Sequence, residues 1–446
     1  MNPGIFKAYD VRGVYPTELN EDVAFKIGRA FVAFMEVERV AVGRDMRVSG
    51  PALSAALMAG MAHQGAEVID LGLTSTDELY FAVGKFGYPA GVMVTASHNP
   101  AEYNGLKMCR ALAMPVSDET GLLDIRDMIL EDRIPAPTRQ GAIVARDVLA
   151  AYIEHALGFI DRSLLRPLKI VADAGNGMAG MTLPGVFSQL PCELIPLYFE
   201  LDGRFPNHPA NPIEPENIVD LQNKVRETGA DLGVAFDGDA DRMFLVDEHG
   251  TFVGGDMVTA MVAQRLLTRD PGAAIVYNLI CSRSVPQTIL ASGGRPIRER
   301  VGHSFIKATM RREDAVFGGE HSGHFYFRDN WYADSGLIAF LTTLELLSAA
   351  NQSLSAVLKP LDPYVRSGEI NSEVADIKAV LAKIEQQHRA AGAQIDKLDG
   401  LTIEYPDWWF NLRASNTQPL LRLNVEASSA AQLQQKTDEV LAVIRG

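Results

Sequence analysis

The sequence has little cysteine and no excess of positive charge. Its three cysteines, Cys109, Cys192 and Cys281, lie far apart and form no CxxC pair. This spacing excludes a disulfide framework or a cysteine zinc site and favours a reducing environment. Lys and Arg number 41 against 56 Asp and Glu, for a formal net charge of −15. That balance argues against nucleic acid or an anionic membrane surface as the main partner.

Long apolar runs are also missing. The first residues, MNPGIFKAYDVRG, lack the apolar core of a signal peptide. The most apolar stretch, residues 337–350, contains two threonines and Glu345, which favours a buried helix over a membrane span. We therefore expect a cytoplasmic protein with no membrane partner.

What the sequence does contain is a strand–helix–strand pattern that occurs three times. The copies begin with short apolar strands at 39–42, 169–173 and 273–278. The third strand of each copy runs into a polar motif; these motifs are TASHNP (95–100), DGDADR (237–242) and GGEHSGH (318–324). Ligands of α/β sheets sit beyond the carboxyl ends of strands. The three motifs are therefore expected to face one shared cleft.

The length of 446 residues favours roughly three domains, and a change of character after about residue 360 predicts a fourth, smaller one. The expected fold class is α/β: three similar α/β domains with mixed, mainly parallel sheets, plus a smaller C-terminal α+β domain, around a central cleft. The expected domains are 1–148, 149–252, 253–361 and 362–446. Two prolines in 359–371 favour a linker, and we expect hinge motion near 360–370.

The DGDADR motif predicts a metal site. Asp237, Asp239 and Asp241 are two residues apart, and on an extended chain such residues face the same way. Three acids between apolar strands repel one another, so a hard cation such as Mg²⁺ or Ca²⁺ is favoured. An EF-hand loop would need glycine where Arg242 stands. A solvated acidic turn is the other alternative.

The remaining motifs are weaker when taken singly. Ser97 and His98 end a strand, where serine is more often a turn residue than a nucleophile. With a metal site elsewhere, a phosphate on Ser97 could supply a missing Mg²⁺ ligand. In GGEHSGH, a carboxylate and a hydroxyl suit sugar hydroxyls, although a flexible turn is an equal alternative. RASNTQP (413–419) suits an anion or a polar turn, and GNGMAG (175–180) is only a weak dinucleotide fingerprint.

Taken in order, TASHNP, DGDADR, GGEHSGH and RASNTQP resemble the α-D-phosphohexomutase superfamily, and most closely bacterial phosphomannomutase/phosphoglucomutase. The resemblance runs from AYDVRG (8–13) to the C-terminal loop. It implies reversible phosphoryl transfer between the 1- and 6-positions of α-D-hexose phosphates, of glucose and/or mannose. The implied route uses a phosphoserine enzyme and a hexose 1,6-bisphosphate, with glucose 1,6-bisphosphate or mannose 1,6-bisphosphate as activator.

The resemblance also implies roles for individual residues. Mg²⁺ would be held by phosphorylated Ser97 and the three aspartates, Asp237, Asp239 and Asp241. The implied catalytic residues are Ser97, His98, Lys107 as a candidate general base, Arg12 and Arg242. The implied substrate-binding residues are Tyr9, Gly302, His303, Glu320, Ser322, His324, Arg413, Ser415, Asn416, Thr417 and Arg422. We expect a monomer whose partners are hexose phosphates.

The sequence departs from the family pattern at two places. Ala240 stands where glycine is common, and Gln418 stands where glutamate is common. Neither change removes a predicted ligand. A phosphoglucosamine mutase remains an alternative, although Asn416 argues against it. A Mg²⁺-dependent serine phosphatase and a non-catalytic sugar-phosphate sensor are further alternatives, and glucose is not ranked against mannose.

Overall fold

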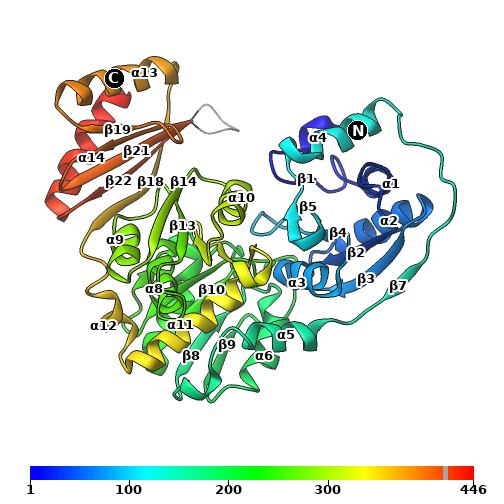
Figure 1. The fold of residues 1–446 in the computed structure, drawn as a ribbon, viewed down its shortest axis with the longest axis horizontal. Helices are drawn as coiled ribbons and strands as arrows, with labels where there is room; N and C mark the ends of the chain where they lie inside the picture. Colours follow the sequence, from blue (N-terminus) through cyan, green and yellow to red (C-terminus); the bar gives the residue numbers. More distant parts are fainter. Residues whose placement is uncertain (415–419, 446) are drawn as a thin grey trace.

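The structure, a computed structural model, describes residues 1–414 and 420–445. These residues form four β-sheets, which we assign to four domains (Figure 1). In Figure 1 the fourth domain, orange and red, lies beside the third and away from the blue first domain. The predicted site residues Ser415, Asn416 and Thr417 lie outside the described residues, as does Gln418.

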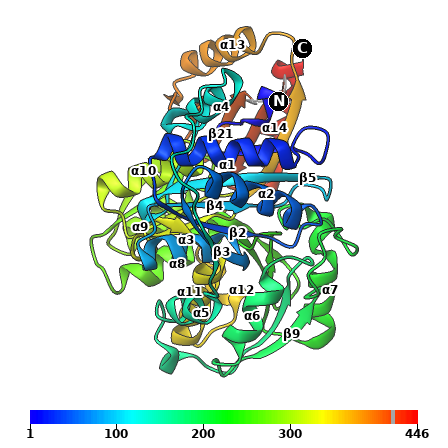
Figure 2. The same ribbon diagram turned by 90° about the vertical axis from the view of Figure 1, so that its right-hand side faces the viewer.

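The first sheet has the strand order β1-β5-β4-β2-β3-β7, with β6 paired to β5. Its strands are β1 (Val11–Val14), β2 (Arg39–Arg44), β3 (Glu67–Leu73), β4 (Ala90–Val94), β5 (Tyr103–Arg110), β6 (Met114–Pro115) and β7 (Ile143–Ala145). The flanking helices are α1 (Glu21–Met35), α2 (Gly50–His63), α3 (Thr76–Phe86) and α4 (Leu122–Leu130). Figure 2 shows α1 and α2 side by side against this sheet.

The second and third sheets have the orders β12-β11-β10-β8-β9 and β14-β13-β15-β16-β17. The second domain contains α5 (Leu149–Leu157), β8 (Lys169–Asp173), α6 (Ala179–Phe187), β9 (Glu193–Leu197), α7 (Val219–Thr228), β10 (Leu232–Phe236), β11 (Met243–Asp247) and β12 (Phe252–Val253). The third contains α8 (Gly255–Leu267), β13 (Ala274–Asn278), α9 (Ser284–Ala291), β14 (Arg295–Glu299), α10 (His303–Glu313), β15 (Phe317–Gly319), β16 (Phe325–Phe327), β17 (Ala333–Asp334), α11 (Gly336–Ala350) and α12 (Leu354–Leu358).

The same hairpin recurs in these three sheets. A strand that pairs in parallel on one side, β4, β10 or β15, turns back into an antiparallel strand, β5, β11 or β16. The turns carry TASHNP, DGDADR and the EHSGH part of the third motif. The predicted α/β class is confirmed, with three mixed sheets whose motifs follow the carboxyl ends of corresponding strands.

The fourth domain is built on an antiparallel sheet with the order β18-β22-β21-β20-β19. Its elements are β18 (Val365–Glu373), α13 (Ile377–Ala390), β19 (Gln394–Asp396), β20 (Leu401–Glu404), β21 (Trp408–Ala414), β22 (Leu420–Ala427) and α14 (Ala430–Arg445). Since β18 begins at Val365, residues 365–371 are strand, and the predicted linker shrinks to 359–364.

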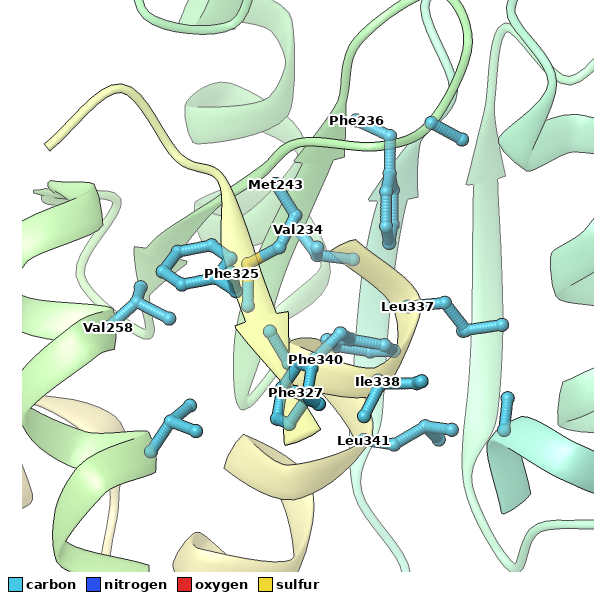
Figure 3. Close-up of a cluster of buried hydrophobic side chains, with 14 of the residues drawn as sticks. Val234, Phe236, Met243, Val258, Phe325, Phe327, Leu337, Ile338, Phe340 and Leu341 are labelled. Atoms are coloured by element: carbon cyan, nitrogen blue, oxygen red, sulfur yellow. The ribbon is translucent and has the colours of Figure 1, made fainter. Parts of the chain in front are cut away.

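One continuous hydrophobic core joins the first three domains. It contains side chains from α3 of the first domain, from β10 of the second and from β16 and α11 of the third. Figure 3 shows Val234 and Phe236 of β10 beside Phe325 of β16 and Phe340 of α11. The fourth domain has a separate core between its sheet and helices. Of the three predicted boundaries, 148/149 and 252/253 therefore cut through this shared core, and the second also falls inside β12. The boundary at 361/362 separates the shared core from the core of the fourth domain.

The apolar stretch 337–350 forms most of α11, as predicted for a buried helix, and Leu337–Ser348 are all buried. Its one charged residue, Glu345, pairs with Arg265 and Arg269. None of the described helices combines the length and apolar character that crossing a bilayer requires.

Candidate active site

Ser97 lies in the turn between β4 and β5 and is 4% exposed. Its backbone has φ +51°, a left-handed conformation that is uncommon for serine. The hydroxyl Oγ donates to Asp237 Oδ2 at 2.7 Å and lies 3.3 Å from His98 Nδ1. The first domain therefore presents a serine hydroxyl directly to the aspartate motif of the second.

The aspartate motif forms a tight turn between β10 and β11. Carboxylate oxygens of Asp237, Asp239 and Asp241 all lie within 4.8 Å of one another. The sequence argument assumed an extended chain here, but the chain turns, because Ala240 has φ +63°. A left-handed turn, rather than a strand face, brings the carboxylates together.

Basic and hydroxyl side chains surround the three carboxylates. Lys107, on β5, donates to Asp239 Oδ2 at 2.7 Å and to Asp241 Oδ2 at 2.5 Å. Thr76 Oγ1, at the start of α3, donates to the same Asp239 oxygen. Arg242 Nε donates to Asp237 Oδ2 at 2.9 Å. Two permanent cations, Lys107 and Arg242, thus face three carboxylates, and His324 Nδ1 lies 3.8 Å from Asp241 Oδ1.

The carboxylates retain unused acceptors, which provides a test of metal binding. Asp239 Oδ1 and Asp241 Oδ1 are buried and have no hydrogen-bond partner among the described residues. A buried carboxylate oxygen without a partner is costly, and a hard cation would satisfy it. The donor set, all carboxylate oxygen, fits a divalent cation.

Electrostatics assign protonation states to the neighbouring bases. Burial lowers the pKa of His98 well below its ordinary value, and Arg242 and Arg12 lower it further, so this imidazole is neutral. Burial alone would also lower the pKa of Lys107. Asp239 and Asp241 outweigh that effect and raise this pKa well above its ordinary value. Lys107 is therefore a cation in this arrangement.

A cleft of about 430 Å³ opens beside Ser97. Predicted residues from three domains line it: Tyr9, Arg12, Ser97, His98, Lys107, Asp241, His303 and His324. Arg12 is held toward the serine turn by its bond to Asn99 Oδ1 at 2.7 Å. Gly302 precedes α10 with φ +136°, and a Cβ there would lie 2.7 Å from the Tyr9 hydroxyl. The first and third domains thus meet where Gly302 lies against Tyr9, and there is no room for a side chain at residue 302.

The third motif divides between the core and the cleft. Glu320 is 2% exposed, accepts from the Tyr326 hydroxyl and from Asn278 Nδ2, and is not among the described residues that line the cleft. Ser322 is half-buried in the turn and is not among them either. His324 does line it, with Nδ1 3.0 Å from Asp334 Oδ2. Of the three predicted side chains of this motif, the structure brings one to the cleft.

A second pocket, of about 250 Å³, lies where the first, third and fourth domains meet. Tyr9 lines both pockets, and Arg413 lines this one together with Arg300. Arg413 and Arg422, on β21 and β22, each lie within 3.7 Å of Glu369. Arg413, in the described part of the fourth motif, thus places its guanidinium beyond Tyr9 and outside the cleft beside Ser97.

Sequence reasoning missed several residues that support the site. Asp45 and Arg47 are buried beneath the serine turn. Thr76 donates a hydrogen bond to Asp239, and Lys307 forms an ion pair with Asp334. A signal existed for the first pair, since GRDMRVSG (43–50) follows the first strand of the repeat just as the predicted motifs follow the third. Thr76 and Lys307 lie inside helices and carry no such signal.

Comparison with known proteins gives a consistent result. Four family models, described as phosphoglucomutase/phosphomannomutase domains I, II and III and the C-terminal domain, match residues 3–133, 150–250, 254–364 and 369–443. A phosphohexose mutase of Xanthomonas campestris is 44% identical, and a phosphomannomutase of Escherichia coli is 42% identical. Both matches span 99% of each chain.

A crystal structure of a phosphoglucomutase/phosphomannomutase family protein from Burkholderia thailandensis shares the fold, with a TM-score of 0.92 and 37% identity. It covers 100% of this chain and 98% of its own. Because the family models and the relatives agree over nearly the whole length, the chain belongs to the phosphoglucomutase/phosphomannomutase family and is a phosphohexose mutase.

Proposed function

We propose that the chain moves a phosphoryl group reversibly between the 1- and 6-positions of α-D-hexose phosphates of glucose and/or mannose. Ser97 carries the group, and a hexose 1,6-bisphosphate, of glucose or mannose, is both intermediate and activator. The hydrogen bond of 2.7 Å from Ser97 Oγ to Asp237 carries this proposal. It places a nucleophile of one domain against the carboxylate cluster of another, at the edge of a cleft.

We propose Mg²⁺ as the cation of this site. Asp237, Asp239 and Asp241 would hold it together with a phosphate oxygen on Ser97. The two partnerless carboxylate oxygens and the all-oxygen donor set support this assignment. When bound, such an ion neutralises charge on a transferring phosphoryl group.

The side chains around Ser97 prepare the transfer. In one half-reaction the bond from phosphorus to Ser97 Oγ breaks as a bond to a sugar hydroxyl oxygen forms, and the proton of that hydroxyl ends on Ser97 Oγ. Arg12, held by Asn99, is placed to bind phosphoryl oxygens. Arg242 fixes Asp237, and neutral His98 orients the serine turn. Lys107, a cation in this arrangement, can act as a base only after it loses a proton, which requires that its ion pairs with Asp239 and Asp241 break first.

The rest of the cleft would hold the sugar and its second phosphate. Tyr9, His303 and His324 line the space next to Ser97, and Gly302, which lies against Tyr9, is proposed as a further substrate contact. Arg413 and Arg422, with Ser415, Asn416 and Thr417 outside the described residues, are proposed for the non-reacting phosphate. Glu320 and Ser322 are proposed for sugar hydroxyls, and Glu320 must exchange its bond to Tyr326 for one to substrate. We further propose a cytoplasmic monomer.

A phosphorus NMR time course tests the proposal. The protein would receive glucose 1-phosphate, Mg²⁺ and a trace of glucose 1,6-bisphosphate, with mannose 1-phosphate in a parallel sample. We expect the 6-phosphate signal to grow without inorganic phosphate, and Ser97→Ala to abolish the growth. Release of inorganic phosphate would instead indicate a phosphatase. Turnover of glucosamine 1-phosphate, with neither other sugar used, would indicate a phosphoglucosamine mutase.

A further inference from the structure

Arg47 makes an unusual set of contacts with the serine turn. Its Nη2 donates to the carbonyls of Ser97 at 2.9 Å and Asn99 at 2.5 Å. Its Nη1 donates to the carbonyls of Pro100 at 2.7 Å and Tyr103 at 2.9 Å. The side chain is 0% exposed and is not among the described residues that line the cleft. One guanidinium therefore binds the backbone of the whole turn from the protein side.

Asp45 extends this hold to the other side of Ser97. Its carboxylate accepts from the Arg47 backbone N–H at 2.9 Å and from Thr95 Oγ1 at 2.6 Å. Thr95 Oγ1 in turn accepts from the Ser97 N–H at 2.9 Å. The amide nitrogen and the carbonyl oxygen of Ser97 are thus both tied to the segment 45–47.

Such a hold is needed because the Ser97 backbone is strained. A left-handed conformation is unfavourable for a non-glycine residue, and it persists only where the surroundings over-determine it. Four donors of the guanidinium are used on carbonyls, and the fifth, Nε, lies 3.4 Å from Asp45. A planar fork can satisfy this geometry, whereas the single ammonium of lysine cannot reach four carbonyls.

The second domain seals the contact from water. The Phe205 ring centroid lies 5.2 Å from the Arg47 guanidinium carbon. A Cβ at Gly203 would lie 2.5 Å from Arg47 Cα, so only glycine allows this approach. A Cβ at Gly238, inside the aspartate motif, would lie 2.5 Å from the Ser97 carbonyl oxygen. Buried from water, these hydrogen bonds are stronger than they would be at a surface.

We propose that Arg47 is a positioning residue for phosphoryl transfer, holding the backbone of Ser97 so that Oγ stays aimed at Asp237. The proposal rests on the proposed role of Ser97 as phosphoryl carrier. Because Arg47 acts through the turn and not on substrate, its loss lowers kcat and leaves KM for the hexose phosphate nearly unchanged. The same residue serves both half-reactions, since both use Ser97.

Arg47→Lys and Arg47→Ala test the proposal, with Arg39→Ala as control; Arg39 is an exposed arginine at the start of β2, the strand that precedes the loop of Arg47. Small misplacements of a reacting group cost about 100-fold in rate, so we expect kcat of both Arg47 variants to fall between about 10-fold and about 100-fold. KM should change by less than about 3-fold, because Arg47 does not contact the substrate and its loss removes no interaction that binds the ground state. Added ethylguanidinium should restore part of the kcat of Arg47→Ala, and ethylammonium should not.

Hydrogen exchange followed by mass spectrometry provides a readout that needs no turnover. Amides of 95–103 should exchange faster in Arg47→Lys, while the fourth domain, with its separate core, should exchange as before. Unchanged exchange in 95–103 would overturn the proposal whatever the activity. The proposal would also be overturned if ethylguanidinium restored the thermal stability of Arg47→Ala without raising its kcat. Wild type and Ser97→Ala run in parallel, so failure of the proposed function would appear as equal turnover in those two.

Discussion

At the scale of single residues, the site is a cluster of acids that one lysine holds together. Lys107 bonds two of the three aspartates, and removing one partner of a buried ion pair leaves the other charge uncompensated. In Lys107→Met we expect the free energy of unfolding in EDTA to fall by about 3 kcal/mol. Mg²⁺ should recover much of this loss, because a cation can replace the ammonium.

Urea denaturation with EDTA and with Mg²⁺ measures this effect. Lys26→Met, at an exposed pair with Asp22, is the control and should change stability by less than about 0.5 kcal/mol. Equal losses for Lys107→Met with and without Mg²⁺ would contradict the cation site.

The residues that sequence reasoning found and missed differ in how far their partners lie along the chain. Ser97 and the three aspartates stand in short motifs at strand ends, where position alone indicates chemistry. Arg47 and Thr76 bind partners about 50 and 163 residues away. The residues next to them in sequence do not indicate which partners these are. Glu320 is a third case: its motif was visible, but its hydrogen bond to Tyr326 was not.

At the scale of elements, α3 begins at a buried, titratable cap. Ser75 and Glu78 form a capping box, and Glu78 is 1% exposed. Burial raises the pKa of Glu78 from 4.5 to about 8. The folded state therefore binds this proton more tightly than the unfolded chain does. Its stabilising contribution is complete below about pH 4.5 and is lost as pH rises toward about 8.

Glu78→Gln should remove this loss, because glutamine still accepts the Ser75 N–H but cannot ionise. We expect the variant to become more stable than wild type as pH rises, by about 1 kcal/mol or more near pH 8. Denaturation curves across this range give the measurement. Glu227→Gln, exposed on α7, controls for the loss of one carboxylate. A stability difference that is constant with pH would refute the argument.

Elements were predictable where periodicity and strand-end motifs coincide. The three strands that end at the motifs followed from the sequence for that reason, whereas the antiparallel pairing of the strand that returns from each motif was not predicted. The ends of elements were harder to predict, because backbone conformation decides them. Asp314, with φ +49°, ends α10, and β15 begins only at Phe317. The strand in 365–371 was mistaken for linker since its partner, β22, lies about 50 residues further along the chain.

At the scale of the whole molecule, polar contacts join the third and fourth domains. The Arg283 guanidinium donates to the carbonyls of Tyr405, Pro406 and Trp408, and its backbone N–H donates to Glu426. Each such bond contributes about 0.5–1.5 kcal/mol net. Arg283→Ala should therefore loosen the fourth domain, which carries Arg413.

Small-angle scattering and steady-state kinetics measure this loosening. We expect a larger radius of gyration and a KM raised by about 10-fold, the equivalent of one such bond. Arg389→Ala, at an exposed pair with Glu385 on α13, is the control. An unchanged radius and KM in Arg283→Ala would show that other contacts fix the fourth domain.

The shared core of the first three domains also limits how this molecule can evolve by recombination. A chimera that exchanges the second domain alone must rebuild the contacts of Phe236 with Phe340 and of Tyr152 with Phe81 at the same time. An exchange after residue 364 leaves the shared core and the separate core of the fourth domain intact. Descendants of such crossovers should therefore inherit Ser97 and the three aspartates as a block, while the C-terminal arginines can come from another parent.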